Sequence, residues 1–365
     1  MALNFTVKTR IFLGVLIYTL TICQSLPLLA LDASEALNQI KQKAMELETS
    51  GTKVLQGKDG WLFFSGELRS ISVGQFWGEA AVKVSRASRA QAMDPLPAIL
   101  EFNTQCQEAG AELLLVPVPA KAVIYADKLV DGLEKTGEGV LPRVDLHHQA
   151  FYKILREHGI NVLDMTDLFL RERQGGKELY CRDDTHWSSY ACLLTAKAIH
   201  AEVAGREWLK NHNPTESDIV SIERPLAIKG DLWGYLTGVD AREEILPMFY
   251  VGKSRGKDAI PTPLQPDRQS PVILMGDSHT LVFNAGGDLH AQGAGLADHL
   301  AQQFGFMVDL VGVRGAGTTV PRVDLARRKD NLKDKKLVIW CFSARQFTES
   351  VNGWMQKVPV IRKEN

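Results

Sequence analysis

Short runs of consecutive apolar residues recur along the chain and predict the strands of a buried sheet. The runs are AELLLVPV (111–118), INVLD (160–164), PVILMGDS (271–278), MVDLVGV (307–313) and LVIWCF (337–342). A strand that is covered on both faces carries apolar side chains continuously, whereas a half-exposed strand alternates apolar and polar positions. These runs therefore indicate a sheet with a layer of structure on each side.

Segments with helical periodicity separate the apolar runs and predict the covering layers. The helical patterns occupy 95–108, 144–158, 188–204 and about 292–305. Strands that alternate with helices are typical of a parallel sheet with helices on both faces. The expected fold class is therefore α/β, with a three-layer α/β/α domain built around a central parallel sheet.

The segment 205–270 breaks this alternation. It is rich in Pro, Asp, Lys and Gly and shows no clear periodicity. Long segments of this kind in compact domains are often functional. We interpret it as a long insertion packed over the sheet, inside a single domain that spans 51–365.

Two local patterns stand ahead of the predicted sheet. The polar stretch SEALNQIKQKAMELETS (34–50) predicts a helix with Ser34 as its N-cap, which would form a stalk before the domain. In GKDGWLFFSGE, Asp59 and Gly60 precede an aromatic run. That order is typical of a hairpin turn that leads into a strand.

The first residues of the chain have the pattern of an export signal. Lys8 and Arg10 precede an uncharged apolar stretch over 11–30. A positive start followed by such a stretch is typical of a signal peptide, and its length also suits a membrane-spanning helix. We therefore expect residues 1–33 to be a cleaved signal peptide or a retained membrane anchor. The positive side stays in the cytoplasm, so the rest of the chain should face outward.

The composition is that of a globular protein, with 45% hydrophobic residues and a net charge of -1 over 365 residues. A charge so close to neutral gives no reason to expect a nucleic acid partner. An oxidising compartment permits disulfides, but the sequence does not choose between the possible pairings and free buried thiols. The cysteines beyond the apolar N-terminal stretch are Cys106, Cys181, Cys192 and Cys341.

The run VILMGDSHT predicts a reactive serine. Ligands of open α/β sheets bind outside the carboxyl ends of the strands, and Ser278 follows such an end directly after Gly276-Asp277. A helix that begins behind the serine would direct N–H groups at the same point and favour a developing oxyanion. The alternative is an ordinary strand-to-helix turn in which Ser278 is only the N-cap.

A serine hydroxyl needs a neighbouring base, and the base needs an orienting group. His279 is a poor candidate because adjacent side chains on a turn usually diverge. The segment YCRDDTHWSS offers His186, with Asp184 two positions and Asp183 three positions before it. An aspartate at that distance can accept the Nδ1–H of the histidine, which leaves Nε2 free for the serine proton. The alternative is a polar cluster that caps the following helix.

The two segments together resemble a known family. DTHWS, followed after about ninety residues by GDSHT, is similar to the alginate O-acetyltransferase proteins of the AlgJ/AlgX type. Their SGNH hydrolase-like domain places the Asp-His pair before the serine. Other stretches are also similar to family segments, namely GKDGWLFF, LLLVPVPAKAVIYADKL (113–129), KGDLWGYL (229–236) and LVIWCFSARQF (337–347).

The resemblance implies a function and a role for each residue. Ser278 would be the nucleophile, His186 the base and Asp184 the orienting acid, because the D-T-H-W pattern selects Asp184. The D-x-x-H pattern of general SGNH hydrolases would select Asp183 instead. The implied reaction is O-acetyl transfer to hydroxyls of an exported polysaccharide through an acyl-serine, without a cofactor.

The resemblance also implies partners and a location. A membrane-bound O-acyltransferase would supply the acetyl groups, and a polysaccharide export complex is a further expected partner. The protein would be periplasmic, either anchored in the inner membrane by its N-terminal segment or released after signal cleavage.

Two further residues are candidates for oxyanion or substrate binding. The backbone N–H of Ser278 is one oxyanion donor, and Gly315, in the loop after MVDLVGV, is a weaker one. Arg345 ends the last predicted strand and would contact an anionic sugar. The alternative for Arg345 is a structural ion pair.

Two other functions remain open at this stage. If water instead of a sugar accepts the acyl group, the protein is a carbohydrate acetyl esterase of the SGNH type. A non-catalytic polysaccharide-assembly protein would keep the fold without the reaction. The D-x-H pairs Asp184/His186 and Asp288/His290 suggest a metal site, but no further residue completes a ligand set in the sequence, so no metal is expected.

Overall fold

The computed structural model describes Met1, residues 31–212 and residues 218–361. The predicted signal or anchor over 1–33 therefore lies almost entirely outside the described residues. Within the described ranges, none of the helices combines the length and the apolar character that crossing a membrane requires.

A five-stranded parallel sheet forms the centre of the domain, with the strand order β4-β3-β9-β7-β8. Each predicted apolar run contributes one strand. The strands are β3 (Glu112–Val118), β4 (Asn161–Val162), β7 (Val272–Gly276), β8 (Asp309–Gly312) and β9 (Leu337–Ser343). The predicted fold class is confirmed.

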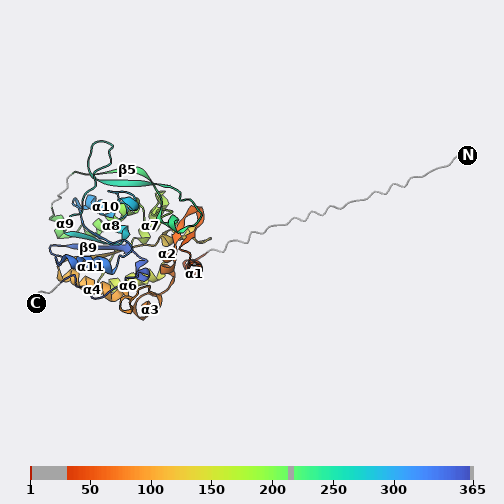
Figure 1. Ribbon diagram of the computed structural model, residues 1–365, viewed down its shortest axis with the longest axis horizontal. Coiled ribbons are helices and arrows are strands. Elements are labelled where there is room, and N and C mark those ends of the chain that lie inside the picture. Colours follow the sequence, from red (N-terminus) through yellow and green to blue (C-terminus); the bar gives the residue numbers. More distant parts are fainter. Residues whose placement is uncertain (2–30, 213–217, 362–365) are drawn as a thin grey trace.

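Helices cover both faces of the sheet (Figure 1). One face is covered by α8 (Ser189–Val203) and α10 (Leu296–Phe304). The other face is covered by α4 (Pro95–Glu108), α6 (Leu146–Glu157) and α11 (Thr319–Arg328). The remaining helices are α1 (Ala33–Ser50), α2 (Ser65–Ser72), α3 (Ala81–Val84), α5 (Lys121–Ile124), α7 (Thr166–Glu172), α9 (Glu207–Lys210) and α12 (Gln346–Glu349).

The alternation of side chains along each strand divides the core into two layers. Successive residues of a strand point to opposite faces of the sheet. In β9, Ile339 and Cys341 contact the cluster that includes α8 and α10, whereas Trp340 and Phe342 contact the cluster that includes α4, α6 and α11. Both faces need apolar side chains, which explains why the strands read as continuous apolar runs.

The N-terminal helix α1 packs against the domain and is not a separate stalk. Ala36, Ile40, Ala44 and Leu47 recur at helical spacing, are buried, and belong to the same core cluster as the sheet. The N-cap is Asp32 and not the predicted Ser34, since the Asp32 side chain accepts the first backbone N–H groups. The sequence looked polar because only one narrow stripe of the helix is apolar.

The predicted hairpin turn near the start of the domain is present. β1 (Val54–Gln56) pairs antiparallel with β2 (Leu62–Phe64). Asp59 (φ 55°) and Gly60 (φ 78°) both adopt left-handed backbone angles between the strands, which is the conformation that an Asp-Gly turn favours.

The insertion over 205–270 contains a hairpin that the sequence analysis missed. β5 (Ile219–Ile228) and β6 (Glu244–Lys253) pair antiparallel along their full length. Figure 1 shows β5 above the layer of α8 and α10, and β6 contacts both helices. We had expected the insertion to pack over the sheet. Instead, its hairpin packs over α8 and α10. Pro225 and Pro247, paired across the hairpin, mask its strand pattern.

The four cysteines within the described residues are free thiols, and all are buried. They are Cys106, Cys181, Cys192 and Cys341. Of the alternatives that the sequence left open for these residues, the structure has free buried thiols.

Candidate active site

Ser278 lies at the carboxyl end of β7, as predicted. Gly276 lies so close to β9 that a Cβ atom at this position would be 1.5 Å from the Cys341 carbonyl oxygen. Only glycine fits this approach. The chain then turns through a short 3-10 segment, Ser278–Thr280, in place of the expected helix. The next α-helix, α10, begins only at Leu296.

The buried carboxylate of Asp277 holds this turn in place. Its oxygens accept the backbone N–H of His279 (2.9 Å) and the backbone N–H of Ser343 at the end of β9 (2.9 Å). Burial alone would raise the pKa of Asp277, but the His279 side chain, the charge of Arg345 and the Ser343 N–H hold the pKa at about 2. The ionised side chain therefore ties the serine turn to the central strand.

His186 and Asp184 meet Ser278 at this edge. The Nε2 atom of His186 lies 2.8 Å from the Ser278 Oγ atom, and Nδ1 lies 2.6 Å from Asp184 Oδ1. The exposed fractions of the three residues are 8% for Ser278, 6% for His186 and 1% for Asp184. The three predicted residues therefore form one continuous hydrogen-bonded chain in a nearly dry environment.

The structure separates the two candidate aspartates. Asp184 accepts the His186 ring, the His186 backbone N–H (2.9 Å), the Asp231 backbone N–H (2.9 Å) and the His290 Nε2–H (3.1 Å). Asp183 points elsewhere and accepts the indole N–H of Trp233 at 2.9 Å. Asp184 is thus the carboxylate that orients the histidine ring.

Asp184 and His186 each stabilise the charged form of the other. Burial would raise the pKa of Asp184, but His186 and His290 hold this pKa well below its usual value. Burial would lower the pKa of His186, yet the charge and hydrogen bond of Asp184 outweigh it and raise the pKa. Asp184 therefore stays ionised, and His186 is a stronger base than a free histidine.

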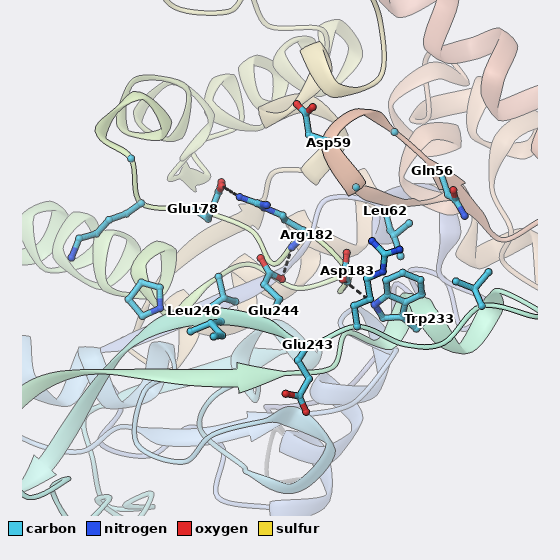
Figure 2. Close-up of a pocket in the computed structure, with 18 residues that line it drawn as sticks. Gln56, Asp59, Leu62, Glu178, Arg182, Asp183, Trp233, Glu243, Glu244 and Leu246 are labelled. Carbon is cyan, nitrogen blue, oxygen red and sulfur yellow. Dashed lines mark hydrogen bonds and ion pairs between the residues drawn. The ribbon is translucent and has the colours of Figure 1, made fainter.

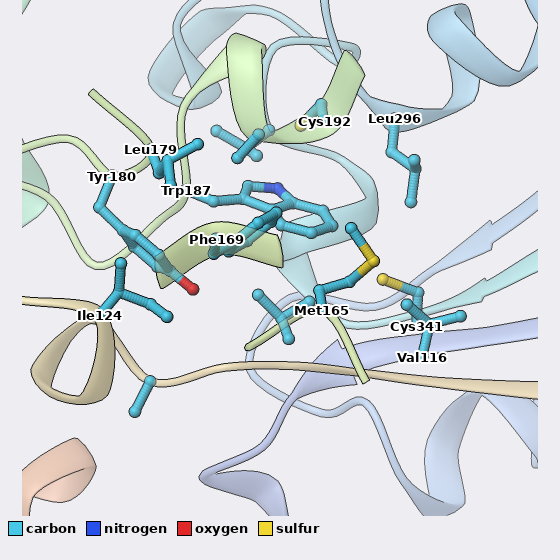
Figure 3. Close-up of a cluster of buried hydrophobic side chains, with 14 of the residues drawn as sticks. Val116, Ile124, Met165, Phe169, Leu179, Tyr180, Trp187, Cys192, Leu296 and Cys341 are labelled. Atoms are coloured by element: carbon cyan, nitrogen blue, oxygen red, sulfur yellow. The ribbon is translucent and has the colours of Figure 1, made fainter. Parts of the chain in front are cut away.

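Trp187 anchors the His186 loop in the core. Figure 3 shows its indole ring among buried side chains that include Cys192 of α8 and Cys341 of β9. The indole N–H donates to the His279 carbonyl oxygen at 3.1 Å. One side chain thus links the histidine loop directly to the serine turn, which fixes their separation.

A buried lysine also holds the loop that carries His186. Lys121, in α5 after β3, is fully buried, and its Nζ atom donates to the carbonyl oxygens of Cys181 (3.1 Å), Arg182 (3.1 Å) and Asp184 (2.7 Å). An ammonium group has three N–H donors, so each has one acceptor. The sequence analysis missed this role, although Lys121 lies in the quoted segment 113–129.

We expect Lys121→Met to lower the free energy of unfolding by about 3 kcal/mol, because the buried carbonyl groups of Cys181 and Asp184 lose the Lys121 donor and the Arg182 carbonyl keeps only the Leu62 N–H. Urea denaturation followed by circular dichroism measures the loss. Lys128→Met is the matched control, since Lys128 pairs with the exposed Asp59 on the surface, and it should stay close to the wild type. Equal losses in the two variants would contradict this assignment.

The segment Gly230-Asp231 also holds the loop and was not selected as part of the site. A Cβ atom at Gly230 would be 2.0 Å from the Asp183 carbonyl oxygen, so the two backbones are in direct contact. The Asp231 carboxylate accepts the backbone N–H (2.8 Å) and hydroxyl (2.7 Å) of Thr185. The only sequence signal for this contact was the quoted segment KGDLWGYL.

Ligand atoms of Asp184, His186 and Asp231 lie within 4.8 Å of one another, a spacing that a metal ion could bridge. However, both nitrogens of His186 and all carboxylate oxygens of the two aspartates already have hydrogen-bond partners. The second D-x-H pair is split, because Asp288 pairs with Arg314 on the surface.

Arg345 and Gly315 lie on the wall of a neighbouring pocket of about 740 Å³. Arg345 makes an ion pair with the buried carboxylate of Glu67, with 3.2 Å between the charged atoms. The structural ion pair considered for Arg345 is therefore present. Gly317, two residues after Gly315, packs against Asp277, where an added Cβ would be 3.0 Å from the Asp277 Cβ. The loop that contains both glycines thus reaches the serine turn.

A larger pocket of about 780 Å³ borders the outer side of the histidine loop. Figure 2 shows Arg182 and Asp183 on its wall, with Asp183 bonded to Trp233. The Arg182 backbone N–H donates to Glu244 (2.8 Å), and burial raises the pKa of Glu244 to about 7. The wall carries basic side chains that donate hydrogen bonds and acidic side chains that accept them. This mixture suits a ligand rich in hydroxyl groups.

Comparisons with known proteins identify the family of this chain. The model of the family described as "SGNH hydrolase-like domain, acetyltransferase AlgX" matches residues 54–344. The probable alginate O-acetylase AlgJ of Pseudomonas aeruginosa is 25% identical over 299 residues, which cover 80% of this chain and 70% of AlgJ. The AlgJ of Pseudomonas fluorescens is 24% identical over 306 residues, which cover 80% of this chain and 68% of that protein.

Solved structures show the same fold. The O-acetyltransferase domain of Pseudomonas putida AlgJ superimposes with a TM-score of 0.58 at 21% identity, covering 81% of this chain and 92% of that domain. Pseudomonas aeruginosa AlgX superimposes with a TM-score of 0.57 at 16% identity, covering 85% of this chain and 66% of AlgX.

Proposed function

The chain belongs to the family of SGNH hydrolase-like domains of the AlgX acetyltransferase type, and from this premise we propose that it transfers acetyl groups to hydroxyls of an exported polysaccharide. The observation that carries the proposal is the hydrogen-bonded chain from Ser278 Oγ through His186 to Asp184. A serine activated in this way forms acyl esters.

The first half of the reaction forms an acetyl-serine. Asp184 accepts the Nδ1–H of His186, so the Nε2 lone pair faces the Ser278 hydroxyl. As Oγ attacks the acetyl carbonyl of the donor, His186 takes the serine proton and then passes it to the leaving group. The bond between the acetyl carbon and the leaving group breaks, and the acetyl group stays on Ser278.

The second half transfers the acetyl group to the sugar. His186 removes the proton of a sugar hydroxyl, whose oxygen attacks the acetyl-serine. The ester bond to Ser278 breaks and Oγ recovers its proton from His186. The oxyanion that develops in each half would be bound by the Ser278 backbone N–H and by a backbone donor of the loop at Gly315.

The proposed partners follow from the N-terminal pattern and from the relatives. Two relatives are named probable alginate O-acetylases, which supports a polysaccharide as the acceptor. The apolar stretch over 11–30 would export the domain to the periplasm, as an anchor or as a cleaved signal. A membrane-bound O-acyltransferase would supply acetyl groups there, within or beside a polysaccharide export complex.

Product analysis tests the proposal. The purified protein is incubated with p-nitrophenyl acetate and with alginate-type or neutral oligosaccharides, and mass spectrometry reports acetylated sugar and free acetate. We expect an acetylated sugar with the wild type and none with Ser278→Ala. Free acetate alone, across all acceptors, would indicate an acetyl esterase. If both proteins gave only the products of a reaction without protein, the proposal would be contradicted and a non-catalytic assembly protein favoured.

A further inference from the structure

A second histidine contacts the carboxylate that orients His186. The Nε2 atom of His290 lies 3.1 Å from Asp184 Oδ2, and its side chain is only 10% exposed. The sequence suggested pairing His290 with Asp288, but Asp288 is exposed and bonds to Arg314. His290 therefore points inward, away from its sequence neighbour.

The backbone at His290 is held in an unfavourable conformation. Its φ of 73° and ψ of -88° lie close to the strained γ-turn region that non-glycine residues rarely adopt. The surrounding loop enforces it through backbone bonds from Gly286 to Ala291 (2.9 Å) and from Phe283 to Leu289 (2.9 Å). Strain of this kind persists where the surrounding structure fixes a residue for a function.

We propose that His290 is a positioning residue for acetyl transfer, which fixes the Asp184 carboxylate and thereby sets the basicity of His186. This inference rests on the proposed function of the Ser278 site. His290 acts through Asp184, because its hydrogen bond ends on the oxygen that does not face His186.

The two oxygens of Asp184 have different tasks. Oδ1 accepts the His186 ring, whereas Oδ2 accepts His290 and the Asp231 backbone N–H (2.9 Å). Two donors on Oδ2 fix the plane of the carboxylate, so Oδ1 remains aimed at the imidazole. They also draw negative charge toward Oδ2, which weakens the attraction between Oδ1 and a protonated His186.

Removing the His290 donor is therefore expected to change the pKa of His186 in one direction. More negative charge returns to Oδ1, the His186 imidazolium becomes more stable, and the pKa of His186 rises. The acid limb of the pH profile of kcat/KM reports the pKa of this base in the free enzyme, so it should move to higher pH. The other titratable or charged groups around His186 and Asp184 stay constant in the comparison, namely Lys121, Asp231, Asp277, His279 and Arg345.

Two variants of similar size separate positioning from structure. His290→Leu removes the donor, whereas His290→Gln keeps an N–H donor, and both carry the same backbone strain. With p-nitrophenyl acetate we expect His290→Leu to lower kcat/KM roughly 10-fold, the effect of losing one hydrogen bond to a charged group, and to shift the acid limb to higher pH. His290→Gln should keep the limb in place and recover most of the rate.

Several outcomes would overturn the inference. An unshifted acid limb in His290→Leu would do so even if the rate fell, as would identical profiles for the two variants. His290→Ala replaces the Leu variant if that one does not fold, as judged by circular dichroism. Ser278→Ala is measured in parallel: if it remains active, the proposed function of the site fails, and that failure is distinct from an unshifted limb.

Discussion

Replacing Ser278 with alanine is expected to lower kcat for acetyl transfer roughly 10⁴-fold or more, because no other group can form the acyl ester. The fold should be retained, since the Ser278 hydroxyl bonds only to His186 among the described side chains. Mass spectrometry after a brief reaction with p-nitrophenyl acetate should detect an acetyl group on the tryptic peptide of the wild type that contains Ser278, and none in the variant.

The double variant provides the internal control. His186→Ala alone should cost nearly as much as Ser278→Ala, because each removes the activated nucleophile. Combining the two should cost no more than either alone, as expected for residues that act as one unit. Losses that multiply in the double variant would mean that the two side chains work independently, contrary to the 2.8 Å contact.

The central sheet could be predicted because its signal is local and redundant. Each strand is buried on both faces, so its apolar run is visible without knowledge of its neighbours. The hairpin of β5 and β6 lacks this property, since one side of β5 is largely exposed and prolines interrupt both strands. Helix α1 was recognised as a helix, but its burial depends on contacts with distant residues.

The residues of the site likewise include some that the sequence could predict and some that it could not. Ser278 and His186 could be selected as candidates because their residue types and positions carry chemistry on their own, whereas only the family resemblance selected Asp184 over Asp183. Lys121 and His290 could not, because their roles exist only after folding has brought distant segments together. His290 lies 106 positions from Asp184 in the chain. A lysine after a strand is normally exposed, and the three carbonyl groups around Lys121, together with the carboxylates of Glu67 and Asp184, explain its burial.

Asp184→Asn is expected to lower kcat about 10⁴-fold, the loss typical of an orienting aspartate that can no longer fix the histidine tautomer. Each Asp184 oxygen accepts hydrogen bonds from two donors. An asparagine has one acceptor oxygen, so its NH₂ group must face two donors in either orientation. The variant should therefore misplace His186 as well as alter its charge.

Asp183→Asn is the matched control, one residue away in the same loop and with the same chemical change. The amide oxygen of the substituted side chain could still accept the Trp233 indole N–H that Asp183 accepts, so kcat should fall by less than about 10-fold. The pair also decides between the two spacings that the sequence offered. If Asp183→Asn were the more damaging change, the histidine would take its orienting carboxylate three positions before it, and the geometry around Asp184 would describe a resting arrangement that the reaction does not use.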